Sequence, residues 1–169
     1  MLRYTLYEIR RSVLSFSSLF YTIIMPVGLY LLFGALQDYA KIKVADGNAA
    51  AYVMIGIALY GAISCTVSIS GLTVVENVAG WGRQLGLTPM NTGKYLLSKC
   101  CVAFIMAAVP ITAVNIVARM TKIDMPLKQQ IACAALSILC AMVFGFFGLA
   151  IGFLVPSESA VGIANGILV

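Results

Sequence analysis

Few residues in this sequence have the types and the spacing that support chemistry. The 169 residues include no histidine, which excludes imidazole metal sites and the Ser-His and Cys-His pairs of nucleophilic enzymes. The five cysteines form no metal-binding pattern, and we expect no disulfide. The stretch from Gly86 to Lys94 ends in Gly-Lys like a phosphate-binding loop, but six residues separate its two glycines and Tyr95 replaces the required Ser or Thr. The sequence therefore predicts no catalytic residue, no metal site and no cofactor or nucleotide site on this chain.

The segment 76–90 has a pattern that suggests a contact with another molecule. On a helix, Trp81 and Leu85 would share an apolar face and Arg83 would point the other way. Thr88-Pro89 should end such a helix, because proline disfavours the α conformation in the residue before it. A short amphipathic helix continuous with a membrane span could transmit a push from a docked partner. The alternative is an interfacial loop whose Trp81 anchors in the lipid headgroups.

Small and polar residues within the apolar stretches are the other candidates. One set, which falls within a narrow arc of a helix, could line a path through the membrane or allow close helix packing: Gly61, Ser64, Ser68 and Gly71. Gly148-x3-Gly152 and Gly162-x3-Gly166 suggest close packing in the same way. Asn115 is predicted to form an interhelical hydrogen bond, with a substrate contact as the alternative.

The elements that must position these residues are membrane helices. The chain is 62% hydrophobic and only 10% charged, whereas soluble domains are about 45–50% apolar and about 25% charged. This composition excludes a water-soluble domain, and the excess of apolar residues with a net charge of only +5 excludes disorder. The partner that the composition predicts is the lipid bilayer, and we expect no nucleic-acid binding.

The charged residues gather in short clusters, and the stretches between them are long enough to cross a bilayer. About 20 apolar residues in a helix cross a hydrocarbon core of about 30 Å. We therefore predict an all-α polytopic membrane protein, a single transmembrane domain over 1–169, with complete spans near 17–37, 51–75, 100–118 and 131–155. The apolar stretch 160–169 is too short to cross, and we expect it to be the start of a fifth span of a longer protein.

The N-terminal residues 1–13 are predicted to form an interfacial amphipathic helix. Leu2, Leu6, Ile9 and Val13 fall on one side of a helix, and Glu8 with the arginines occupies the remainder. The alternative is a basic flank without order. Lysine and arginine are almost evenly divided between the two sides, so only the basic N-terminus favours an inside start.

The predicted spans contain no ionisable side chain. Proton-coupled and ion-coupled carriers usually need such groups at membrane depth. If the protein moves a substrate, its energy is therefore expected to come from outside the membrane.

The segment from Glu76 to Met90 also carries a resemblance to a known family. Its residues Gly80-Trp81, Arg83-Gln84-Leu85 and Leu87-Thr88-Pro89-Met90, followed by a span with a basic flank, resemble the membrane subunits of type-2 ATP-binding-cassette exporters. Tyr7–Arg11, Met25–Gly34 and Pro156–Ser159 are similar to the same family, so that the resemblance covers the whole chain.

The resemblance implies a permease with six spans, an interfacial N-terminal helix and an inside N-terminus, located as a multi-pass protein in the bacterial cytoplasmic membrane. It implies a separate ABC ATPase subunit, which binds ATP and magnesium, and a second permease in a homodimer or heterodimer. It also implies that 76–90 is the cytoplasmic coupling loop. The transmission residues, carried over by position, are Glu76, Trp81, Arg83, Gln84, Leu85, Thr88 and Pro89.

Three functions follow as hypotheses. The first is the permease subunit of an ABC exporter that moves a hydrophobic or amphiphilic compound, such as a drug, an antibiotic or a lipid. The second is a non-transport membrane protein, such as an immunity or assembly factor whose basic loop rests on anionic lipid. The third is a secondary carrier, which would need a buried acid or base beyond Val169.

Overall fold

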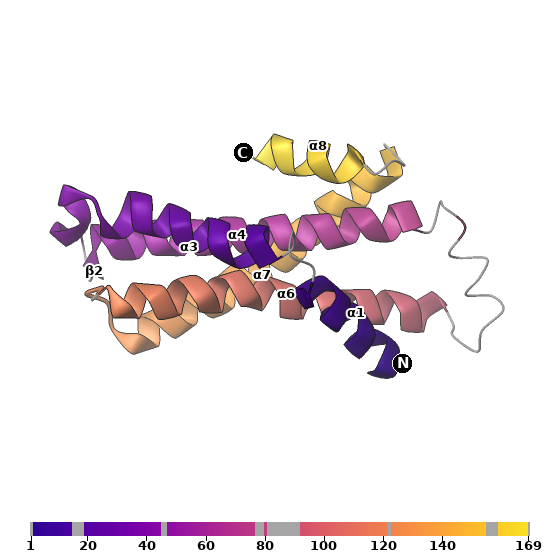
Figure 1. Ribbon diagram of the computed structural model, residues 1–169, viewed down its shortest axis with the longest axis horizontal. Helices are drawn as coiled ribbons and strands as arrows, with labels where there is room; N and C mark the ends of the chain where they lie inside the picture. Colours follow the sequence, from indigo (N-terminus) through magenta and orange to yellow (C-terminus); the bar gives the residue numbers. More distant parts are fainter. Residues whose placement is uncertain are drawn as a thin grey trace.

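The structure is a computed structural model that describes residues 2–14, 19–44, 47–76, 80, 92–121, 123–154 and 159–168. Its long helices run side by side along one axis (Figure 1). In chain order the elements are α1 (Leu2–Leu14), the π-helix η1 (Phe20–Ile24), α3 (Met25–Tyr30), the π-helix η2 (Leu31–Ala35), the 3-10 helix η3 (Asp38–Lys41), strands β1 (Lys43–Val44) and β2 (Gly47–Asn48), α4 (Ala49–Glu76), α6 (Thr92–Met120), α7 (Leu127–Leu154) and α8 (Ser159–Leu168).

The fold class predicted from the sequence, an all-α polytopic membrane protein, is confirmed. Among the described residues, α4, α6 from Gly93 onward, and α7 are long and apolar enough to cross a membrane. The segment Phe20–Ala35, within the predicted first span, is a shorter apolar helix. It contains Pro26, which has no N–H to donate, and π-helical turns lie on both sides of the proline.

The burial pattern of α7 is the reverse of that in a water-soluble helix. Its buried residues are small or polar, namely Gln130, Ser137, Ala141, Gly145, Gly148 and Gly152. Its exposed side chains include large apolar ones, such as Phe146 and Phe153, both 73% exposed, and Leu154 at 77%. Lipid tails are as apolar as these side chains, so a helix in a bilayer gains nothing by turning them inward, and close backbone packing selects small residues instead.

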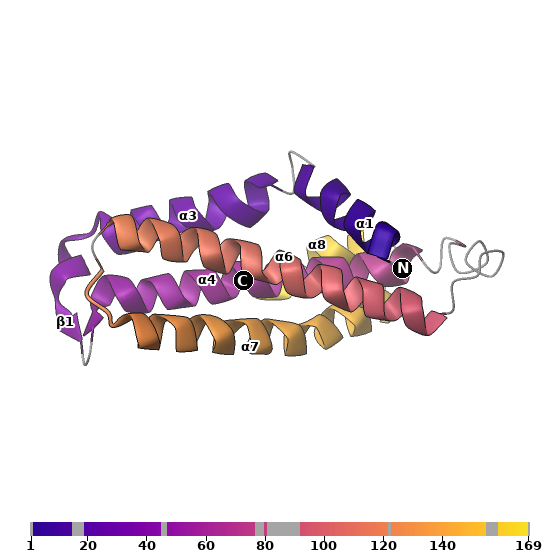
Figure 2. The ribbon, with the colours of Figure 1, turned by 90° about the horizontal axis from the view of Figure 1, so that it is seen from below.

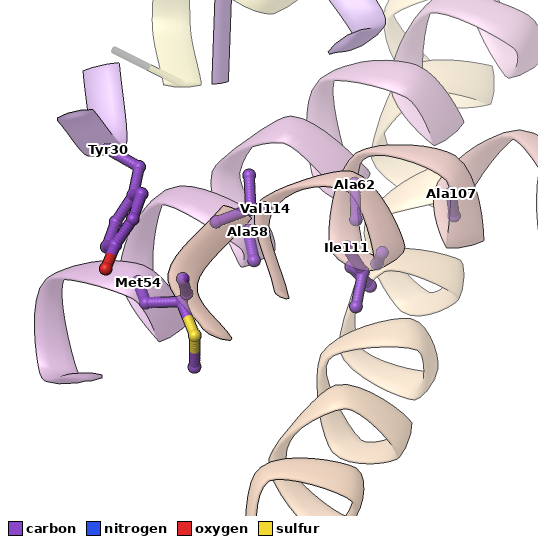
Figure 3. Packing of buried hydrophobic residues seen from close by; sticks show 9 residues of the cluster. Tyr30, Met54, Ala58, Ala62, Ala107, Ile111 and Val114 are labelled. Atoms are coloured by element: carbon purple, nitrogen blue, oxygen red, sulfur yellow. The ribbon is translucent and has the colours of Figure 1, made fainter. Parts of the chain in front are cut away.

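The core lies where α3, α4, α6 and α7 meet, and it is built largely from alanines between a few larger side chains (Figure 3). Tyr30 of α3 is fully buried, and its hydroxyl is 2.8 Å from the Thr121 hydroxyl at the end of α6. In α4 and α6 the buried members are Met54, Ala58, Ala62, Ala107, Ile111, Val114 and Ala118. The small side chains let the helix backbones approach closely.

The two ends of the bundle differ (Figure 2). We call the end with Glu76 and Thr92 the loop end, and the opposite end, with β1 and β2, the hairpin end. The two strands pair antiparallel, with Lys43 opposite Asn48 and Val44 opposite Gly47. This short ladder, which the sequence analysis did not predict, is the one departure from helix among the described elements.

Helix α1 lies obliquely beside α6 in the half of the bundle toward the loop end (Figures 1 and 2). The sequence predicted an apolar face that includes Leu6 and a polar remainder that includes Glu8. In the structure Leu6 and Tyr7 are exposed, at 69% and 67%, whereas the Glu8 side chain is only 12% exposed and contacts α6. Polar groups of α1 therefore contact the bundle, and the Leu6 and Tyr7 side chains are free to contact lipid.

Candidate functional site

Three segments that are distant in the sequence meet at one ammonium group at the loop end. Lys99 Nζ of α6 donates a hydrogen bond to Glu8 Oε1 of α1 at 2.7 Å and another to Glu76 Oε2 of α4 at 2.8 Å. The lysine is only 8% exposed. Glu76 is the last residue of α4, so the ion pair braces the place where the predicted coupling loop begins.

The geometry of α6 explains how one face supplies the partners of both carboxylates. Tyr95 and Lys99 are four residues apart and therefore lie one above the other on the helix. The Tyr95 hydroxyl donates to Glu76 Oε2 at 3.2 Å, and Lys99 Nζ lies 5.6 Å from the centre of the Tyr95 ring. That ring is 1% exposed, so it shields the ammonium from water. We refer to Glu8, Glu76, Tyr95 and Lys99 as the Lys99 cluster.

A second polar contact lies next to the first and joins the same two helices. The hydroxyl groups of Thr5 in α1 and Ser98 in α6 are hydrogen bonded. Thr5 and Glu8 are three residues apart and share a face of α1, while Ser98 precedes Lys99. Two neighbouring residues of α6 thus hold one face of α1.

The electrostatics of the Lys99 cluster are not balanced. Two carboxylates share one ammonium, and Glu8 Oε2 is buried without a hydrogen-bond partner among the described residues. A buried carboxylate is stable only when a counter-charge compensates for its lost hydration. Glu8 therefore depends on Lys99, whereas Glu76 is a third exposed and also accepts from Tyr95. This arrangement can hold helices in register.

The structure describes only part of the predicted transmission set. Glu76 belongs to the Lys99 cluster. The other predicted residues lie outside the described residues: Trp81, Arg83, Gln84, Leu85, Thr88 and Pro89. Their role stays a prediction.

Gly61 lies in the middle of the bundle, between two prolines. A Cβ atom on this glycine would be 3.0 Å from Cβ of Pro110 in α6 and 3.1 Å from Cγ of Pro26 in α3. Gly61 is buried, so it occupies a contact between three helices.

Ser68 and Gly71, two other members of the small-residue set, lie at contacts with neighbouring helices. Ser68 Oγ donates to the Ser64 carbonyl at 2.7 Å and accepts from Asn165 Nδ2 of α8 at 2.9 Å. The Gly71 carbonyl lies 3.2 Å from where a Cβ of Gly152 would be. The described helices use these positions for helix contacts, and a role in the transport path stays a prediction.

Asn115 takes part in a polar group near the hairpin end. Its Oδ1 accepts from Gln130 Nε2 of α7 at 2.7 Å, and Gln130 Oε1 accepts from Arg119 Nε at 2.6 Å. Gln130 is 5% exposed. The interhelical hydrogen bond expected for Asn115 is therefore present, and it joins α6 to α7 where the chain turns between them.

Sequence reasoning did not assign a role to Lys99, Tyr95 or Gln130, and it placed Glu8 on a polar surface. The sequence signal that could have pointed to Glu8 and Lys99 is that charged residues are rare around the spans. Glu8 is the only acidic residue before Asp38, and Lys99 directly precedes the uncharged stretch 100–118. Acidic and basic residues at the boundaries of spans are candidates for pairing, but which of them meet depends on how the helices pack.

No described part of the chain brings three acidic or cysteine side chains close enough to hold a metal ion. A pocket of about 290 Å³ lies at the hairpin end between α4 and α7, lined by Gly47, Ala51, Tyr52, Ile55, Met125, Gln129, Ala132 and Cys133. Its lining is mostly apolar and includes no carboxylate, lysine or arginine.

The sequence model of the family described as ABC-2 type transporter matches residues 2–169. No curated protein and no solved structure gives a significant match.

Proposed function

The chain belongs to the ABC-2 type transporter family and is a membrane permease subunit of an ABC transporter, and we propose that it works as an exporter. Its partner is an ABC ATPase on a separate chain, and it is a multi-pass membrane protein. We place it in the bacterial cytoplasmic membrane with the N-terminus inside, paired with a second permease.

The observation that carries the mechanism is the Lys99 cluster at the end of α4. Glu76 is held by Lys99 and Tyr95 of α6, so the two helices that lead into and out of 77–91 are tied together beside that segment. A force applied to the segment by a docked ATPase would reach both helices at once. This supports the proposal that 76–90 is the coupling loop, with ATP and magnesium bound by the partner.

The proposed substrate class is a hydrophobic or amphiphilic compound, such as a drug, an antibiotic or a lipid. The described helices carry no charged side chain in 51–75, 100–118 or 129–154. Because a charged cargo would need compensating groups at membrane depth, such walls favour an apolar one.

The test is ATPase activity with the full-length permease and its ATPase in lipid vesicles. We expect the wild-type permease to stimulate ATP hydrolysis, and Trp81→Ala with Arg83→Ala to abolish the stimulation while the protein still inserts. Asp38→Asn, an exposed change at the hairpin end, is the control and should keep the stimulation. If no ATPase co-purifies with the permease, the exporter proposal fails, and a non-transport role such as immunity or assembly becomes the better explanation.

A further inference from the structure

We propose that Lys99 is a positioning residue that makes α1 move together with the start of the coupling loop. The inference rests on the proposed function for its consequence in transport, but its geometric part concerns this chain alone. It assigns to α1 a mechanical role that depends on a single shared ammonium group.

The first step is that polar contacts join α1 to α6. Leu6 and Tyr7 are about two-thirds exposed. On the same helix, the Thr5 hydroxyl is hydrogen bonded to Ser98, and Glu8 is paired with Lys99. Loss of the Glu8 contact therefore weakens the attachment of α1 to α6.

The second step is that Lys99 donates hydrogen bonds to two different helices, α1 and α4. An ammonium group has three N–H donors. One is directed to Glu8 and one to Glu76, and the Tyr95 ring lies beside the same nitrogen. Both bonds start from the same nitrogen atom. A displacement of Glu76 at the end of α4 therefore moves Lys99 Nζ and changes its electrostatic attraction to Glu8.

The third step is the asymmetry between the two acids. Glu76 keeps a bond from Tyr95 if Lys99 is lost, whereas Glu8 has a second oxygen that is buried and has no partner among the described residues. Neutralising Glu8 therefore weakens the attachment of α1 to α6 and leaves the contact between α4 and α6 intact. Glu8→Gln therefore tests the contact of α1 with Lys99 separately from the contact of Glu76 with Lys99, and glutamine has nearly the same shape as glutamate.

The geometric test uses a disulfide between α1 and α6 in full-length permease whose five native cysteines are replaced by alanine. Thr5→Cys with Ser98→Cys places two thiols where two hydroxyl groups now touch. We expect rapid oxidative cross-linking in this background, a several-fold slower reaction when Glu8→Gln is added, and no change when Asp38→Asn is added. Equal rates with and without Glu8→Gln would overturn the positioning role.

The functional test follows in vesicles with the ATPase. We expect Glu8→Gln to lower permease-stimulated ATP hydrolysis several-fold. The disulfide between positions 5 and 98 should restore it, and reduction should remove the restoration. If Glu8→Gln slows cross-linking but leaves the stimulation unchanged, α1 has no part in transmission and the inference is wrong. If the wild type itself gives no stimulation, the proposed function fails instead, and the cross-linking result still decides the geometry.

Discussion

Gly148 of α7 lies directly against the backbone of Val67 in α4. A Cβ atom on the glycine would come within 2.5 Å of the Val67 carbonyl oxygen and 2.8 Å of its Cα. Neither neighbour is a flexible side chain that can move aside. The close contact between α4 and α7 therefore requires glycine at this position.

Gly148→Ala is predicted to destabilise the protein by about 1–3 kcal/mol, because the two backbones must separate to admit a methyl group. Thermal unfolding of the detergent-purified full-length protein measures the effect. Gly56→Ala is the matched control, since a Cβ at Gly56 meets no other atom within 4 Å. An unchanged melting temperature for Gly148→Ala would contradict the packing of α4 on α7.

Gly61→Ala is predicted to cost about 1 kcal/mol, at the lower end of the range for overpacking. The added methyl group would press on the rings of Pro26 and Pro110, which cannot rotate away as a flexible side chain does. Gly28→Ala should have no such effect, because Gly28 lies in α3 two residues after Pro26 and has open space around it. Equal melting temperatures for the two variants would show that the three helices do not meet at Gly61.

Gln130→Leu is predicted to weaken the hairpin of α6 and α7 by about 1–3 kcal/mol. The change leaves Asn115 Oδ1 without its donor and Arg119 Nε without its acceptor. Limited proteolysis between α6 and α7 should become faster, while Lys128→Ala, an exposed neighbour, should leave the rate as in the wild type. If Gln130→Leu resists proteolysis as well as the wild type does, the polar group does not hold the hairpin together.

Lys99→Met is predicted to destabilise the loop end by about 3 kcal/mol, because it leaves two carboxylates close together without their counter-charge. Adding Glu8→Gln should recover part of the loss by removing the buried charge that depends on Lys99. Lys94→Met, an exposed change on the same helix, is the control and should be close to neutral. Thermal unfolding of the three variants and the wild type measures these differences, and a Glu8→Gln addition that brings no recovery would argue against charge as the cause.

The membrane helices could be predicted because the bilayer imposes one condition on every span, a long stretch without charge. The Lys99 cluster could not, since Glu8 and Lys99 are 91 residues apart and meet only through the position of α1 on α6. Sequence periodicity gave α1 an apolar face, but the ion pair with Lys99 turned Glu8 toward the bundle.

The two glycine pairs are a second case in which the sequence alone could not predict the contacts. Gly148-x3-Gly152 packs closely on α4, as the spacing suggests, whereas a Cβ at Gly162 or Gly166 would meet nothing within 4 Å. The two motifs are alike in sequence, and only the arrangement of the helices distinguishes them. The two-residue ladder of β1 and β2 was also missed, because so short a pairing leaves no alternation of apolar and polar residues to detect.

The helical segment Phe20–Ala35 leaves regular α geometry on both sides of Pro26. Kinks in helices arise at prolines and at π-helical turns. Pro26 also lies against the position of Gly61, where three helices meet. A bend at Pro26 would therefore act directly on the contact among α3, α4 and α6.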